Sequence, residues 1–61
     1  MTKPQTRQVE LARHYVRLGH ADVAARSISA LIRCAMRQRD IEELRQVARE
    51  LGIEAHPDFV C

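Results

Sequence analysis

Aromatic residues, glycine, proline and cysteine are all scarce in this chain of 61 residues, which has one Tyr, one Phe, no Trp and two each of the other three. Two cysteines are too few for the disulfide framework of a small extracellular domain. Oxidation of Cys61 could join two copies, although a reducing cytosol disfavours this. The longest stretch without a charged residue is 27–32, much shorter than the ~20 apolar residues that cross a bilayer. No apolar segment follows Met1, so we expect no signal peptide, no membrane partner and a cytoplasmic protein.

The residue types that perform enzyme chemistry lack their usual spacing. The histidines His14, His20 and His56, taken with the cysteines, show no CxxC or HxxxH pattern that would place two metal ligands on one helix face. Glu42 and Glu43 are adjacent and diverge around a helix, so they cannot act as acid and base on one substrate. Glycine-rich phosphate loops and nucleophile elbows are absent from the sequence. We therefore expect no metal, no cofactor and no enzymatic activity.

What the chain does contain is a strongly apolar segment at residues 22–37. Its polar residues recur at steps of three and four, which places them on one narrow line of a helix: Asp22, Arg26, Ser29, Arg33 and Arg37. Nearly all the other residues of the segment are apolar. An ordinary surface helix buries an arc of about 100°. This helix needs a wider cover, so we expect neighbours on at least two of its sides.

Two further segments have the periodicity of amphipathic helices, and each is followed by a glycine. Residues 4–18 carry two apolar lines, one of Leu11, Tyr15 and Leu18 and the other of Val9, Ala12 and Val16. Residues 40–51 carry one apolar stripe, made of Ile41, Leu44, Val47, Ala48 and Leu51. Gly19 and Gly52 follow these segments, and glycine readily adopts the left-handed conformation that ends a helix.

The connection between the first two segments is so short that their helices must run antiparallel. We therefore predict an all-α fold in one domain, residues 1–61. It is a three-helix antiparallel bundle with an irregular C-terminal tail and helices at about 4–18, 21–37 and 40–51. Asp40 is expected to open the third helix as its N-cap. Phe59 and Val60 of the tail can pack against the bundle.

A chain of this length buries only roughly 60% of the surface that its unfolded form exposes, so a second copy or another partner is expected to stabilise it. The residues of the middle helix expected to face inward are Ala24, Ile28, Leu31 and Ala35. They should pack against Leu11, Tyr15, Leu44 and Ala48. The contact surface for another protein is then expected at Ala25, Ser29, Ile32 and Met36. On this interpretation the chain is a small adaptor or inhibitor that docks a helical face on another protein and self-associates as a homodimer.

The net charge of +2 hides an asymmetry, because residues 1–39 carry +6 and residues 40–61 carry −4. One interpretation is two solvated faces that attract each other within the fold. The other is a basic surface that binds an acidic protein, or contacts nucleic-acid phosphates without reading their sequence. The alternative function is therefore a nucleic-acid-binding or regulatory protein that uses Arg13, Arg17, Arg26, Arg33, Arg37 and Arg39.

Tyr15, Leu18, Gly19 and Ala24 have the spacing of an aromatic residue, Leu-Gly and a small residue, and in this the chain resembles the middle of a tetratricopeptide repeat. The resemblance covers about residues 11–36. It implies an antiparallel helical hairpin that binds peptides or proteins in a concave groove. The chain departs from the family in having no early aromatic residue, no closing proline and fewer than the roughly three units that repeats usually need. The same residues also fit a generic helical hairpin with a glycine turn.

Residues 46–53, QVARELGI, resemble the first helix and turn of a helix-turn-helix DNA-binding domain. That family places a recognition helix immediately afterwards. Here the next residues are acidic and include Pro57, which disfavours a helix. The same segment is equally typical of an ordinary helix C-terminus, and this is the interpretation that we prefer.

Overall fold

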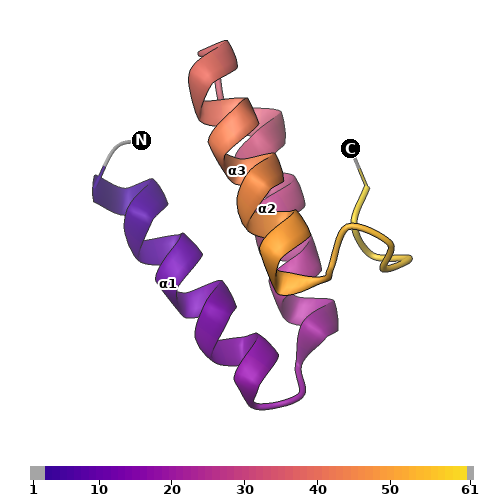
Figure 1. Cartoon of the computed structure of the whole chain (residues 1–61). Helices are drawn as coiled ribbons and strands as arrows, with labels where there is room; N and C mark the ends of the chain where they lie inside the picture. Colours follow the sequence, from indigo (N-terminus) through magenta and orange to yellow (C-terminus); the bar gives the residue numbers. More distant parts are fainter. Residues whose placement is uncertain (1–2, 61) are drawn as a thin grey trace.

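The computed structural model describes residues 3–60 of the chain. In this range it has three α-helices and no β-strand (Figure 1), the helices being α1 (Lys3–Arg17), α2 (Ala21–Cys34) and α3 (Gln38–Leu51). The prediction of an all-α, three-helix fold is confirmed. No helix within the described range is both long enough and apolar enough to span a membrane. Cys61, the candidate for oxidation, lies outside these residues.

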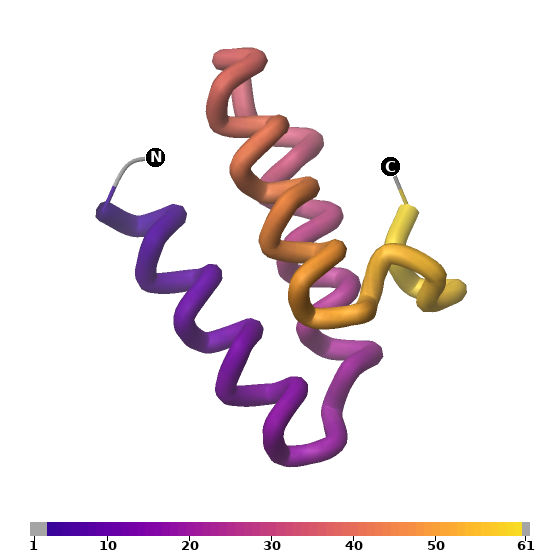
Figure 2. The backbone as a smooth tube through the Cα atoms, viewed as in Figure 1, coloured from indigo at the N-terminus to yellow at the C-terminus, as the bar shows by residue number. Residues whose placement is uncertain are grey.

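The middle helix α2 is the centre of the fold, because it packs against both other helices, whereas α1 and α3 share the smallest interface. Successive helices run in opposite directions, and α1 diverges from the α2–α3 pair toward its N-terminal end (Figure 2). The segment after α3, residues 52–60, is irregular and is called the tail below. The expectation that the most apolar helix has neighbours on two sides is therefore confirmed.

Both glycines end helices in the way that the sequence predicts. Gly19 and Gly52 have φ angles of +84° and +72°, in the left-handed region where a side chain is strained. At the end of α1, His20 N–H donates to the Tyr15 carbonyl at 2.8 Å and Gly19 N–H to the Val16 carbonyl at 3.1 Å. These are the two hydrogen bonds of a Schellman motif. Gly52 and the residue after it repeat the same pattern at the end of α3.

The connection between α2 and α3 differs from the prediction. α2 ends at Cys34 and not at residue 37, because Ala35 and Arg37 are both extended, with ψ angles of 131° and 133°. These extended residues reverse the chain between two antiparallel helices. The predicted N-cap is also wrong, since Arg37 occupies that position and Asp40 lies in the first turn of α3. A carboxylate there is still favourable, because it faces the positive end of the helix dipole.

The core combines large aliphatic residues with alanines at the helix contacts. Its fully buried large side chains are Ile28, Leu44 and Ile53. Ala12, Ala24, Ala25 and Ala48 have no exposed surface, and such small side chains allow the helices to approach closely. Of the predicted inward residues, Ala24, Ile28, Leu44 and Ala48 are buried. Three more are half-buried against the core, namely Tyr15, Leu31 and Ala35.

Helix α1 faces the core with the apolar line of Val9, Ala12 and Val16, and not with the line that begins at Leu11. Val9 and Ala12 are buried and Val16 packs against the core, whereas Leu11 is 42% exposed. The prediction that Leu11 is a core residue is therefore wrong. The two lines lie on different sides of the helix, and the one with the small Ala12 permits the closer approach to α2.

Candidate functional site

The contact surface predicted on α2 is mostly covered within the single chain. Ala25, Ser29 and Ile32 are only 0%, 4% and 7% exposed, whereas Met36 is 97% exposed. The prediction that these four residues form an exposed face is therefore wrong for the first three. Met36 is exposed because α2 ends before it and the turn holds it away from the core.

The tail, residues 52–60, contributes to the burial of α2 around Ser29. Ile53 is buried in the core cluster and Phe59 packs against it. The Val60 backbone N–H donates a hydrogen bond of 3.0 Å to Ser29 Oγ. The expectation that Phe59 can pack against the bundle is confirmed. The periodicity of α2 does not indicate that the tail covers this helix. The available signal was the presence of apolar residues at 53, 59 and 60 in an otherwise acidic segment.

Local hydrogen bonds shape the tail. His56 N–H donates to the Ile53 carbonyl at 3.0 Å, and Phe59 N–H donates to the His56 carbonyl at 2.9 Å. Asp58 N–H donates to His56 Nδ1 at 3.1 Å, so this imidazole nitrogen acts as an acceptor. These two consecutive turns bring Asp58 and Val60 back onto α2. They also leave no recognition helix within residues 52–60, which the helix-turn-helix resemblance would require.

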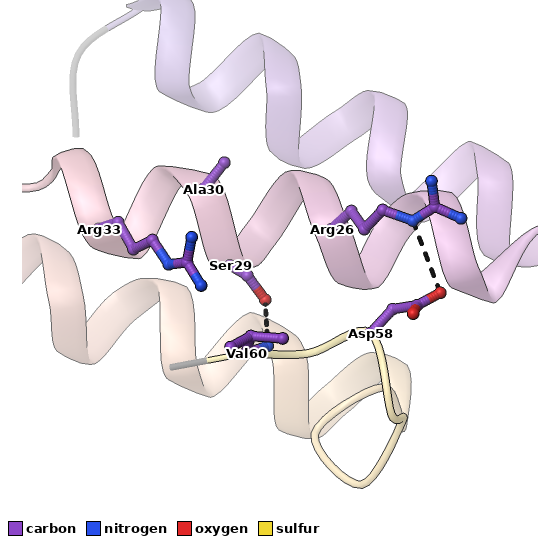
Figure 3. A pocket seen from close by; sticks show the side chains of 6 residues that line it. All are labelled: Arg26, Ser29, Ala30, Arg33, Asp58 and Val60. Atoms are coloured by element: carbon purple, nitrogen blue, oxygen red, sulfur yellow. Dashed lines mark hydrogen bonds and ion pairs between the residues drawn. The ribbon is translucent and has the colours of Figure 1, made fainter.

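A shallow groove of about 240 Å³ lies where the tail meets α2 (Figure 3), and it is lined by Arg26, Ser29, Ala30, Arg33, Asp58 and Val60. At one end, Arg26 Nε lies 3.5 Å from the Asp58 carboxylate. The same guanidinium also contacts Asp22 one helical turn away, at 3.3 Å. At the other end, Arg33 forms no ion pair within the described residues. Among residues 3–60, acidic side chains therefore pair with the arginine at one end of the groove and not with the arginine at the other end.

A second surface is the outer face of α1, which lies beside its core-facing line. Leu11 of α1 and Leu18, which directly follows the helix, are 42% and 58% exposed. They are seven residues apart, so they lie on the same side of α1. Tyr15 is half-buried between them and its ring makes an edge contact with His20, at 6.5 Å between ring centroids. Toward the N-terminal end, Lys3, Pro4, Arg7 and Gln8 line a shallow hollow of the same helix. We call Leu11, Tyr15 and Leu18 the outer face of α1.

The six arginines predicted as a basic surface divide into two groups. Three of them form ion pairs with acidic residues of the same chain: Arg13 with Glu50 at 3.4 Å, Arg26 with Asp22 and Asp58, and Arg39 with Glu43 at 3.7 Å. Arg17, Arg33 and Arg37 form no ion pair within residues 3–60. Arg17 and Arg37 lie near opposite ends of α2, beside different turns. The fold therefore disperses the positive charge and does not gather it into one patch.

Within residues 3–60, no three histidine, cysteine, aspartate or glutamate side chains are grouped so that they could hold a metal ion. Comparisons with protein-family models, with curated proteins and with solved structures find no match for the chain. The resemblance to tetratricopeptide repeats thus stays a prediction. The structure has the antiparallel hairpin that this resemblance implies, formed by α1 and α2 and containing Tyr15 and Ala24. A generic helical hairpin has the same arrangement.

Proposed function

We propose that the protein is a small protein–protein interaction module, an adaptor or inhibitor, that docks on its partner through the outer face of α1. The observation that carries this proposal is the exposure of Leu11 and Leu18 on one side of the helix. Single exposed leucines are common on soluble proteins and need no explanation. Two of them aligned at i and i+7, with a half-buried tyrosine between, match the spacing by which an amphipathic helix contacts a groove or another helix.

The charges of α1 indicate the chemistry of the partner. The helix contains four basic residues and one acidic residue, Glu10. Arg13 is paired with Glu50 of α3, whereas Lys3, Arg7 and Arg17 form no ion pair within the described residues. An apolar partner helix with acidic flanks would satisfy both the leucines and these cations. Charges at the edge of an interface chiefly accelerate association and select the partner.

Self-association is the simplest form of the same proposal, with a second copy as the partner. A face containing two exposed leucines would be covered in a dimer. Analytical ultracentrifugation at micromolar concentration tests this form, because a monomer of 7.0 kDa and its dimer differ twofold in mass. A monomer at every concentration would remove the homodimer and leave another protein as the partner.

The experiment that tests the docking face is affinity capture from the native cell with three matched baits. The variant L11Q/L18Q removes the apolar contacts and keeps good helix formers on α1. The control M36Q changes the most exposed apolar side chain outside α1. We expect proteins captured by the wild type and by M36Q to be lost with L11Q/L18Q. Identical capture by all three baits would contradict the proposed face.

Nucleic-acid binding is the second candidate, and the observation in its favour is that Arg17, Arg33 and Arg37 lack ion-pair partners in the described part of the chain. Arg17 ends α1 and lies at the opposite end of α2 from Arg33 and Arg37. This separation counts against nucleic-acid binding, because phosphate contacts gain strength from adjacent cations. The acidic residues Glu50 and Asp58 also lie beside two of the other arginines, Arg13 and Arg26. We therefore rank it below the interaction module.

A further inference from the structure

The tail occupies one end of the groove on α2 in the way that a bound peptide would. Asp58 contacts Arg26 through its side chain, and Val60 contacts Ser29 through its backbone N–H (Figure 3). We infer that the groove between Arg26 and Arg33 is a binding site for an acidic extended segment of a partner protein, and that residues 58–60 fill part of it as an internal competitor. This site lies on a different face from the proposed docking face of α1 and does not depend on it.

The first argument is the mode of contact. A carboxylate on a guanidinium and a main-chain N–H on a buried hydroxyl are contacts that any acidic peptide can reproduce, whatever its other side chains. Ser29 is 4% exposed, so its oxygen is a fixed acceptor at the floor of the groove. Recognition of main-chain groups supplies affinity, while one or two side chains supply specificity, as in other extended-peptide sites.

The second argument is that the Arg33 guanidinium has no ion-pair partner among the described residues. Arg26 and Arg33 are seven residues apart on α2, which corresponds to about 10.5 Å along the helix axis. An extended chain advances about 3.3 Å per residue, so a carboxylate three positions after the one on Arg26 would reach Arg33. The chain itself places no carboxylate there within the described residues. Arginine binds carboxylates with two parallel hydrogen bonds, so an Asp-x-x-Glu segment would use the whole groove.

The third argument is that the internal competitor is held weakly. The Arg26 and Asp58 side chains are 66% and 39% exposed, and ion pairs in such positions contribute little to stability. Arg26 also retains Asp22 as a partner when Asp58 leaves. Val60 is more than half exposed, whereas Ile53 is fully buried and anchors the start of the tail. Phe59 also packs against the core, so a partner segment that displaces residues 58–60 must place an apolar residue there. The buried Ile53 keeps the start of the tail in the core during this exchange.

Fluorescence anisotropy with a labelled peptide containing Asp-Phe-Val-Glu tests the inference on the full chain. We expect the wild type to bind it, and the variant Asp58→Asn to bind several-fold more tightly because its internal competitor is weakened. Arg33→Glu should abolish binding, whereas the matched control Arg17→Glu should keep it. A peptide with Gln in place of the final Glu should bind more weakly. Circular dichroism establishes that each variant is folded.

Two results would overturn the inference. One is the absence of binding to Asp58→Asn, because the site would then be open and still not recognise the peptide. The other is a general attraction for anions, which would appear as equal loss of binding in Arg33→Glu and Arg17→Glu or as full competition by inorganic phosphate or RNA. L11Q/L18Q should bind the peptide like the wild type, so failure of the α1 face and failure of this groove are distinguishable.

Discussion

The hydrogen bond from the Val60 backbone N–H to Ser29 Oγ joins two residues that are 31 positions apart, at a distance of 3.0 Å. It attaches the tail to the central helix at the residue expected to lie on an exposed interface. Together with the packing of Ile53 and Phe59 on the core, this contact covers Ser29 within the single chain. The exposed large apolar side chains of the described residues are Leu11 on α1, Leu18 directly after this helix, Met36 in the turn before α3 and Val60 in the tail.

The Ser29 contact can be tested directly by amide hydrogen exchange. Replacing Ser29 by Ala removes the acceptor, so the Val60 amide should exchange faster, and the free energy of unfolding should fall by about 1 kcal/mol. The Phe59 amide donates to the His56 carbonyl within the tail and serves as an internal control. Unchanged exchange at Val60 would contradict the role of this bond in holding the tail.

The left-handed end of α3 should be sensitive to substitution. Gly52 has a φ of +72° with open space around it, so the only cost of a side chain there is backbone strain. We expect Gly52→Ala to lower the free energy of unfolding by about 1–2 kcal/mol. Gly52→Asn should lower it less, because Asn tolerates this conformation better. Urea denaturation followed by circular dichroism measures both. Equal effects of Ala and Asn would argue against strain as the cause.

The core should depend on Leu44 far more than the surface depends on Met36. Leu44 is fully buried, and its replacement by Ala should cost about 2–5 kcal/mol, enough to unfold much of a chain this small. Met36 is 97% exposed, so Met36→Ala should change stability by less than about 0.5 kcal/mol. Thermal denaturation of the two variants side by side tests this. A folded, fully stable Leu44→Ala variant would mean that α3 does not pack as described.

Salt dependence separates protein docking from nucleic-acid binding. If arginines bind phosphates, affinity for mixed RNA or DNA should fall by orders of magnitude between low and moderate salt. We expect instead no change in elution when nucleic acid is added at low salt, because acidic residues of the same chain pair with three of the six candidate arginines. A salt-sensitive shift that Arg33→Glu and Arg37→Glu abolish would favour nucleic-acid binding.

The helices and their antiparallel order could be predicted because local features specify them. Apolar periodicity placed all three helices, and Gly19 and Gly52 marked two ends that the structure confirms. The end of α2 at Cys34 could not be predicted, because residues 35–37 contain no glycine or proline. They are extended only because the chain must reverse between α2 and α3. Local sequence carries no signal for that requirement.

The docking surface was harder to predict because it depends on how elements rotate and cover one another. The first helix has two apolar lines, and periodicity alone does not indicate which one faces α2. Because Ala12 allows close packing, the line of Val9, Ala12 and Val16 faces the core, and Leu11 and Leu18 remain exposed. The burial of Ser29 likewise involves the tail, whose hydrogen bond to this residue spans 31 positions and has no periodic pattern.

The central claim is that the outer face of α1 contacts a partner protein, and site-specific photo-crosslinking in the native cell tests it most directly. A photoreactive residue at position 18 reports on this face, and one at position 45, which is also exposed, reports on α3. The account predicts one dominant crosslinked protein, or a crosslinked second copy, from position 18 and none from position 45. The same products from both positions, or no product from position 18, would contradict it.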